Sequence, residues 1–279
     1  MSDTNTMPPI KPGPLIRIGD GPVLLDVAPQ AGGRIAQIVC EGVEQLVGPD
    51  DGDLAMNMWG CFPMVPWAGR LRHGAFDLDG HEYRLPLNLG GHAMHGVGFC
   101  LPWQLDAHSR TQVELSLALP RDERWPFGGM CRQRIELAGR RLHMTLEVTA
   151  GALAMPAVIG WHPWFRKPER IEFHPDGIYP RDGEGIALPP LVSLVQQGPW
   201  DDCFANHRPM VVHRGGQALR LASDCAHWVV YDQPVHASCI EPQTGLPDAF
   251  NVAPHVLAPG SSLGAWFTWE WSDESVEGG

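Results

Sequence analysis

His162 and Glu241 have the chemistry of a proton-transfer pair. Histidine has an unperturbed pKa of about 6.5, so it can donate and recover a proton near neutral pH. Glu241 follows an apolar run and precedes a proline, and partial burial there would raise the pKa of the carboxyl toward a value that suits a general base. From its local sequence alone, His162 could equally be a hydrogen-bonded histidine of the core. The choice therefore depends on partners elsewhere in the chain.

Aromatic residues surround His162. Residues 160–166 read Gly-Trp-His-Pro-Trp-Phe-Arg. Pro163 removes a backbone donor and constrains the chain, which predicts a loop-edge position for His162 rather than a helix. The rings of Trp161 and Trp164 have flat apolar faces that suit the CH-rich face of a sugar, and they would also suit a protein core.

Arg70 and His95 belong to two other segments that are rich in turn residues. The guanidinium of Arg70 is a planar fork of donors that could hold two hydroxyls or a phosphate, although a surface ion pair is the simpler role. His92 and His95 lie in the glycine-rich segment 90–98. Their His-x-x-His spacing is only a weak metal pattern, because no carboxylate is close in the sequence.

Asp201 and Asp202 form a fourth candidate segment, directly after Trp200. Carboxylates in this position commonly cap a turn, and they can also accept hydrogen bonds from a ligand. The sequence leaves open which of the two would face a substrate.

The elements that position these residues are predicted to be β-strands. Apolar and polar residues alternate with a period of two, or β-branched residues cluster, in residues 23–27, 33–40, 113–119, 131–137, 142–148, 210–213, 218–221, 227–231 and 263–271. Asp79-Gly80 predicts a tight hairpin turn within residues 75–85. The stripe of Phe267, Trp269 and Trp271 is expected in the core. No amphipathic helix, Gly-x-Gly-x-x-Gly or P-loop is found, so the predicted fold class is all-β, a large antiparallel β-sandwich or barrel.

Composition and charge restrict the expected partners and compartment. The net charge is −12, which argues against a nucleic-acid partner. The sequence has no signal-peptide pattern and no apolar run of membrane-spanning length, and its seven cysteines include no Cys-x-x-Cys pair. We therefore expect a cytoplasmic protein with reduced thiols. Residues 1–14 are polar and proline-rich and are predicted to be a loose tail before a single domain at 15–279.

Five segments together resemble the aldose 1-epimerase (mutarotase) family. Residues 66–70, Pro-Trp-Ala-Gly-Arg, are similar to the family's Pro-x-x-Asn-Arg, and residues 94–96, Met-His-Gly, to its Leu-His-Gly. Residues 160–165 are similar to Gly-Phe-His-Pro-Tyr-Phe, residues 201–204 to Asp-Asp-x-Phe, and residues 240–242 to the Glu-Pro segment. The order along the chain also agrees, from about Gly33 to the C-terminus.

The resemblance implies a galactose-mutarotase-like β-sandwich, sometimes called a supersandwich. It implies that Glu241 is the general base, that His162 is the general acid and that His95 polarises or hydrogen-bonds the sugar. It also implies that Arg70 and Asp201 hold hydroxyls, and Trp161 and Trp164 are expected to contact the sugar through their rings.

The sequence departs from the family pattern at two of these positions. Gly69 stands where the family usually has Asn, and Trp164 where it often has Tyr. An amide and a phenolic hydroxyl are therefore missing from the expected site.

The expected reaction is the interconversion of the α and β anomers of an aldohexose or a related sugar. A carboxylate and an imidazolium on opposite sides of a cleft one pyranose wide would open and close the ring, without a cofactor or a metal. The sequence gives neither the sugar nor the oligomeric state.

Three alternatives stay open. A hexose-6-phosphate 1-epimerase could build a phosphate pocket from Arg70, Arg72, Arg166 and Lys167. A non-catalytic carbohydrate-binding protein would keep the aromatic residues without needing an acid and a base together. A cupin-type metal isomerase would use His92 and His95 as ligands.

Overall fold

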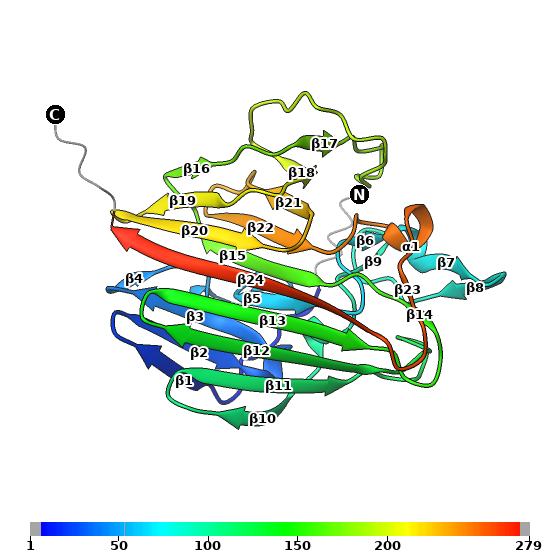
Figure 1. Ribbon diagram of the computed structural model, residues 1–279, viewed down its shortest axis with the longest axis horizontal. Helices are drawn as coiled ribbons and strands as arrows, with labels where there is room; N and C mark the ends of the chain where they lie inside the picture. Colours follow the sequence, from blue (N-terminus) through cyan, green and yellow to red (C-terminus); the bar gives the residue numbers. More distant parts are fainter. Residues whose placement is uncertain (1–6, 53, 274–279) are drawn as a thin grey trace.

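Two antiparallel β-sheets face each other and form most of the molecule (Figure 1). The computed structural model describes residues 7–52 and 54–273. In spatial order, the first sheet contains β1 (Ile16–Asp20), β2 (Val23–Ala28), β3 (Arg34–Cys40), β5 (Cys61–Met64), β15 (Gly160–Arg166), β22 (Ala237–Gln243), β21 (His227–Tyr231), β18 (Asp201–Ala205) and β17 (Gly177–Tyr179), with β4 (Val43–Glu44) paired to β3. The second contains β10 (Gln104–His108), β11 (Gln112–Ala118), β12 (Met130–Ala138), β13 (Arg141–Thr149), β24 (Ser262–Asp273), β20 (Gln217–Ser223), β19 (Met210–Arg214) and β16 (Arg170–Glu172). The predicted large antiparallel β-sandwich is confirmed.

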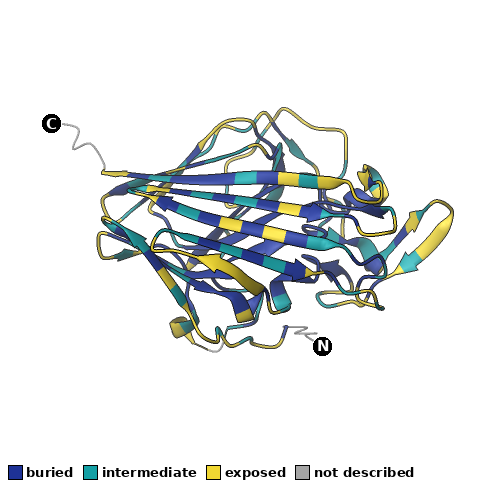
Figure 2. Ribbon diagram, turned by 60° about the horizontal axis from the view of Figure 1, so that its bottom comes forward, coloured by how far each residue is buried: buried dark blue, intermediate teal, exposed yellow. Residues whose placement is uncertain are grey.

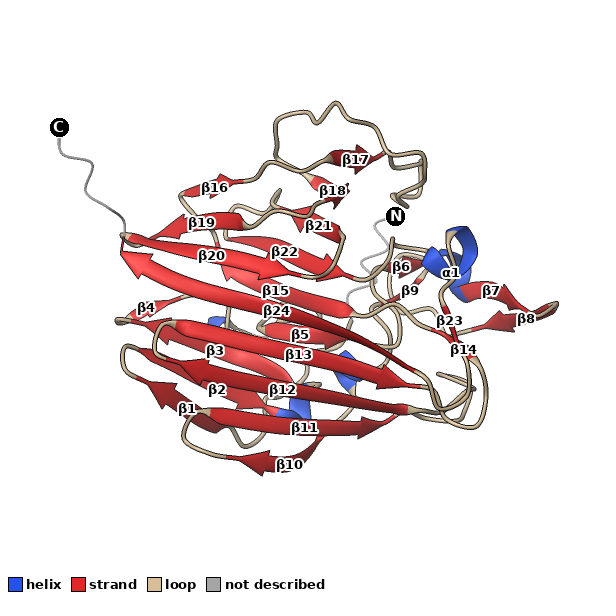
Figure 3. Ribbon diagram, in the orientation of Figure 1, coloured by secondary structure: helices blue, strands red, loops and turns tan. Residues whose placement is uncertain are grey.

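Several short strands and one short helix lie at one end of the sandwich (Figure 3). Three small two-stranded sheets pair β6 (Arg70–Leu71) with β9 (Ala93–Met94), β7 (Ala75–Leu78) with β8 (His81–Arg84), and β14 (Met155–Pro156) with β23 (Val256–Leu257). In the described part of the chain, helical structure is limited to α1 (Ala249–Val252) and the 3₁₀ turns η1 (Pro29–Ala31), η2 (Pro49–Asp51), η3 (Arg72–Gly74) and η4 (Gly98–Cys100). None of the helices described is long and apolar enough to cross a membrane.

Burial alternates along the strands of the second sheet, as the period-two pattern predicts (Figure 2). In β13, Leu142 and Met144 are fully buried, whereas Arg141 and Glu147 are exposed. The buried side chains of this sheet meet those of the first, and the ring of Trp269 lies 4.7 Å from that of Phe165. The aromatic stripe of β24 therefore packs in the core, as expected from the sequence.

The central strand β15 is buried on both faces, and its faces differ in chemistry. Trp161 and Phe165 point into the space between the sheets, where Trp161 packs on Phe267 with ring centroids 5.9 Å apart. Because side chains alternate along a strand, His162 and Trp164 point to the opposite face. His95, in the loop that follows β9, contacts His162 on that face.

Two local predictions differ from the structure. His162 lies inside a central strand and not at a loop edge, because the φ of a proline is compatible with extended backbone and Pro163 costs the ladder only one N–H donor. The start of the described chain, within the expected tail, contacts the domain: Met7 is buried and the N–H of Met56 donates to the carbonyl of Pro8. Residues 1–6 lie outside the described residues.

Candidate active site

The register of two neighbouring strands brings His162 and Glu241 together. β15 pairs with β22 so that Gly160 is opposite Gln243 and Trp164 opposite Cys239, which places His162 opposite Glu241 on the same face. Nε2 of His162 lies 3.2 Å from Oε1 of Glu241, and both side chains are almost fully buried. The predicted acid and base are therefore in contact, side by side, and not on opposite sides of a cleft.

Two aromatic rings hold the His162 imidazole. Phe62, opposite His162 on β5, stacks on it with centroids 4.7 Å apart and an interplanar angle of 23°. Trp164 lies parallel to it at 5.6 Å, and its own Nε1 donates a 2.7 Å hydrogen bond to the carbonyl of Asn57. The imidazole is thus fixed in orientation while Nε2 faces Glu241.

His95 approaches the pair from the loop that follows β9. Its ring is perpendicular to that of His162, with centroids 4.9 Å apart. Its φ is +61°, and the next residue, Gly96, has a φ of +74°. A Cβ at Gly96 would lie 1.9 Å from the carbonyl oxygen of Val65, so only glycine allows this close approach. The Met-His-Gly motif therefore has a packing role as well as a chemical one.

Arg70 begins β6, and its backbone is held by the segment before α1. The N–H of Asp248 donates to the carbonyl of Arg70, and the carboxylate of Asp248 accepts a 2.9 Å hydrogen bond from the N–H of Arg72. The Arg70 guanidinium donates to the carbonyl of Gly185 at 3.3 Å. It has no carboxylate partner among the described residues, so charge and donors remain available for a ligand.

A cavity of about 320 Å³ connects these side chains. Its lining includes His162, Glu241, His95, Arg70, Asp201 and Trp164. The structure thus brings six of the seven predicted site residues to one opening.

Asp201 and Asp202 differ in their position relative to the cavity. Asp201 belongs to its lining and Asp202 does not. Both are bound by Arg181, which donates to Asp201 at 2.6 Å and lies 3.2 Å from Asp202. Asp201 therefore has one oxygen engaged by protein and faces the cavity as an acceptor.

Trp161 is the seventh predicted site residue, and the structure places it elsewhere. It is fully buried between the sheets, and its Nε1 donates a 3.1 Å hydrogen bond to Oε1 of Gln133. It follows that its expected sugar contact is wrong, because neighbouring residues of a strand face opposite ways.

The cations proposed for a phosphate pocket are also elsewhere. Arg72 pairs with Asp182 and Glu184, Arg166 with Glu44 and Asp51, and Lys167 donates to the carbonyl of Asp232. Arg72, Arg166 and Lys167 are absent from the cavity lining. Of the four, only Arg70 reaches the site.

Sequence reasoning missed several lining residues, including Asn57, Met58, Tyr231 and Gln233. Tyr231 could have been found, because the predicted strand 227–231 alternates and Val229, two residues earlier, also lines the cavity. Asn57 and Met58 lie in an irregular loop, where no periodic signal exists.

Burial controls the protonation of the pair. Burial raises the pKa of Glu241 well above its ordinary value; the nearby Asp201 raises it further and Arg70 opposes this. Burial lowers the pKa of His162 to about 3, and the cation of Arg34 adds to this effect. The pKa of His95 is also lowered, first by burial and then by His162 and Arg70. The pair therefore favours a single proton, and moving it across the 3.2 Å contact gives a carboxylate beside an imidazolium.

Arg34 is another residue that the sequence did not single out, and the ring of Phe62 lies between it and His162. Arg34 is fully buried without a carboxylate partner among the described residues and donates to four backbone carbonyls, those of Ala31, Met56, Trp59 and Phe99. Its guanidinium is 5.0 Å from the centre of the Phe62 ring, which stacks on His162. A fixed positive charge thus lies one ring away from the imidazole.

A larger depression, of about 570 Å³, lies on the outer face of the second sheet. Its charged side chains largely neutralise each other: Arg134 lies 3.8 Å from Glu114 and Arg132 lies 4.0 Å from Glu147. It contains no buried acid–base contact of the His162–Glu241 kind among the described residues, so we place the site at the smaller cavity.

Part of the sequence is similar to two curated proteins of Escherichia coli. It is 32% identical over 152 residues to uncharacterized protein YphB of Escherichia coli (strain K12), a match that covers 53% of this chain and 50% of YphB. It is 25% identical over 138 residues to uncharacterized protein YihR of the same organism, covering 48% of this chain and 44% of YihR. The chain spans about half the length of these curated relatives in the matches.

The fold is similar to those of solved structures, and the sequence matches a family model. The fold superposes on an aldose epimerase homologue from C. elegans with a TM-score of 0.83 at 16% identity, covering 94% of this chain and 99% of the other. For galactose 1-epimerase from Lactobacillus acidophilus NCFM the TM-score is 0.78 at 17% identity, with coverage of 94% and 95%. These likenesses show a galactose-mutarotase-like fold. The model of the family described as Aldose 1-epimerase matches residues 14–267. The protein therefore belongs to the aldose 1-epimerase family.

Proposed function

We propose that this protein is an aldose 1-epimerase that interconverts the α and β anomers of an unphosphorylated aldose. The observation that carries the proposal is the 3.2 Å contact between His162 and Glu241 at the cavity. In a cyclic aldose, the C1 hydroxyl and the ring oxygen are bonded to the same carbon. An acid and a base that lie side by side can therefore reach both oxygens of one bound sugar.

The reaction uses the proton that the pair holds. Once it resides on His162, the Glu241 carboxylate accepts the proton of the C1 hydroxyl while the imidazolium donates to the ring oxygen. The bond between C1 and the ring oxygen breaks and C1 becomes a carbonyl carbon. Rotation about the C1–C2 bond presents the other face of the carbonyl, and ring closure returns both protons with the roles of the two residues reversed.

The other lining residues bind and orient the sugar. His95, with a lowered pKa, is neutral and hydrogen-bonds an oxygen near C1. Arg70 donates to hydroxyls and Asp201 accepts from them, which sets the position of the ring over the pair. The face of Trp164 contacts the CH groups.

A phosphorylated substrate is disfavoured by the charges at the cavity. Among the described residues, Arg70 is the one Arg or Lys in the cavity lining, and the carboxyl groups of Asp201 and Glu241 lie in the same lining. Phosphate sites usually gather several cations or backbone donors. A non-catalytic sugar-binding protein of this fold would have no need for a buried acid–base contact.

Polarimetry tests the proposal. Freshly dissolved α-anomers of glucose, galactose and other aldoses are expected to mutarotate faster with the protein, and glucose 6-phosphate to be a poorer substrate by kcat/KM. Glu241→Gln removes the base and is expected to reduce kcat by about 10²- to 10⁴-fold, because that is the usual contribution of one proton-transfer group. Glu147→Gln, at an exposed position of β13, is the control and should keep full activity.

Failure would be clear from the same assays. Sugar binding by calorimetry without any acceleration of mutarotation would assign the protein to the binding class. Unchanged mutarotation in Glu241→Gln would show that this carboxyl is not the base.

A further inference from the structure

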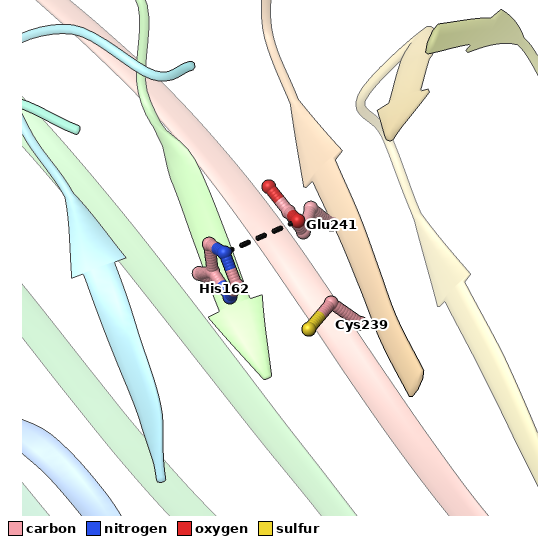
Figure 4. A group of neighbouring side chains, drawn as sticks. All are labelled: His162, Cys239 and Glu241. Carbon is pink, nitrogen blue, oxygen red and sulfur yellow. Dashed lines mark ion pairs between the residues drawn. The ribbon is translucent and has the colours of Figure 1, made fainter. Parts of the chain in front are cut away.

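A thiol that the reaction does not use lies beside the acid–base pair. Cys239 precedes Glu241 by two residues on β22, so its side chain points to the same face. Candidate ligand atoms of His162, Cys239 and Glu241 all lie within 4.8 Å of one another. Figure 4 shows the three side chains projecting toward one another from adjacent strands.

The surroundings of this cluster favour a pre-formed arrangement. All three residues are buried, and β15, β22 and β21 hold them in a continuous hydrogen-bonded sheet. Cys239 is opposite Trp164 on one side and Tyr231 on the other, and these rings meet edge-on at 6.2 Å. His162 and Glu241 line the cavity, so an ion could reach the cluster through it. Among the described residues, no other group of three or more His, Cys, Asp or Glu side chains comes as close.

The three ligand types select one class of cation. Thiolate sulfur, imidazole nitrogen and carboxylate oxygen are the ligands of protein-bound Zn²⁺, which takes four ligands in a tetrahedron. Three protein ligands leave the fourth position for water or a substrate oxygen. Mg²⁺ and Ca²⁺ prefer sites made of oxygen alone and do not match this set.

The charges of the ligand set match a divalent ion. A metal-bound carboxylate, thiolate and neutral imidazole together carry two negative charges, which a dication balances. The remaining charged residues of the lining, Arg70 and Asp201, are of opposite sign.

We propose that His162, Glu241 and Cys239 form a binding site for Zn²⁺ or a divalent transition-metal cation of similar ligand preference, and that its occupation inhibits the enzyme. The ion takes the carboxylate oxygen and the imidazole nitrogen that must exchange protons with the sugar. Only the inhibition rests on the proposed function, because binding of the ion can be measured without any substrate.

Direct binding is the first test. The full chain, treated with a chelator and then freed of it, is titrated with Zn²⁺ in competition with a chromophoric chelator. One zinc per chain is expected for the wild type. Cys239→Ala is expected to weaken binding by at least about tenfold, because even residues that only support a ligand are worth 10- to 100-fold in metal affinity. Cys131→Ala removes an equally buried thiol from the second sheet and should bind like the wild type.

Two further measurements guard against indirect effects. Cobalt in place of zinc should give a thiolate-to-metal charge-transfer absorption that is lost in Cys239→Ala and kept in Cys131→Ala. If Cys239→Ala proves unstable by circular dichroism, Cys239→Val fills the same space with no ligand atom. Mg²⁺ at the same concentration is expected to leave both binding and activity unchanged.

Activity provides the second test. Zn²⁺ is expected to abolish mutarotation by the wild type, a chelator to restore it, and Cys239→Ala to keep its basal rate while becoming at least about tenfold less sensitive to zinc. The proposal is overturned if zinc does not bind, if both cysteine variants bind it equally, or if zinc accelerates the reaction. A protein with Cys239-dependent zinc binding but no mutarotation would keep the metal site and refute the proposed function instead.

Discussion

His162 and Glu241 respond to burial in opposite directions, because burial disfavours the charged form of each. The pKa of His162 falls to about 3 from an ordinary 6.5, and the pKa of Glu241 rises well above 4.5. Between pH 3 and 6.5 the unfolded chain therefore binds a proton on His162 that the folded chain does not. Wild-type stability should decrease in that window as the pH falls. For Glu241 the folded state binds the extra proton, so stability decreases as the pH rises above 4.5.

These signs give a prediction for two variants. Relative to the wild type, His162→Asn is expected to gain free energy of unfolding as the pH falls from about 6.5 toward 3, and Glu241→Gln to gain it as the pH rises above about 4.5. Urea denaturation of the three proteins between about pH 4 and pH 8 measures both differences. Parallel pH profiles for the two variants would contradict the burial of the pair that the structure shows.

At the scale of elements, the loop after β9 determines where His95 lies. Gly96 has a positive φ, and a Cβ added to it would lie 1.9 Å from the carbonyl oxygen of Val65. Gly80 has a similar φ of +76°, but a Cβ added there would have no described atom within 4 Å. Gly80→Ala should cost only the conformational strain, about 1–2 kcal/mol. Gly96→Ala must in addition move the loop away from Val65. We expect a larger drop in melting temperature and a fall in kcat/KM for Gly96→Ala, with unchanged kcat/KM for Gly80→Ala. Equal losses in both variants would show that the close approach to Val65 does not position His95.

Strands and turns with a local sequence pattern were predictable from the sequence, whereas the pairing of distant strands was not. The hairpin at Asp79-Gly80 and the alternating strands were predictable, because turn chemistry and period-two patterning are local. Pro163 interrupts the segment around His162, which predicts a loop edge rather than a strand. Without a strand there, no alternation separates Trp161 from His162, and the sequence predicts both at the sugar. The contact between His162 and Glu241 depends on the pairing of β15 with β22, which local sequence does not encode; the family motifs identified the two residues without their register.

For the whole molecule, the two faces of the first sheet have separate tasks. One face builds the core with the second sheet, through contacts such as Trp161 with Phe267, and the other holds the cavity. Trp161 and Trp164 are near neighbours on one strand, each donates one indole hydrogen bond, and they lie on different faces. A change from Trp to Phe at each position therefore compares the two faces with the same chemistry.

Trp161→Phe is expected to lower the free energy of unfolding by about 1–3 kcal/mol, because Oε1 of Gln133 loses its donor in a buried place. Its KM and kcat should stay near those of the wild type. Trp164→Phe removes indole surface from the cavity and loosens the stack on His162, so a higher KM or a lower kcat is expected, measured by polarimetry on the same sugar. If Trp161→Phe changed KM while its stability stayed intact, the core between the sheets would be part of the binding site, and the division of the sheet into a structural and a chemical face would be wrong.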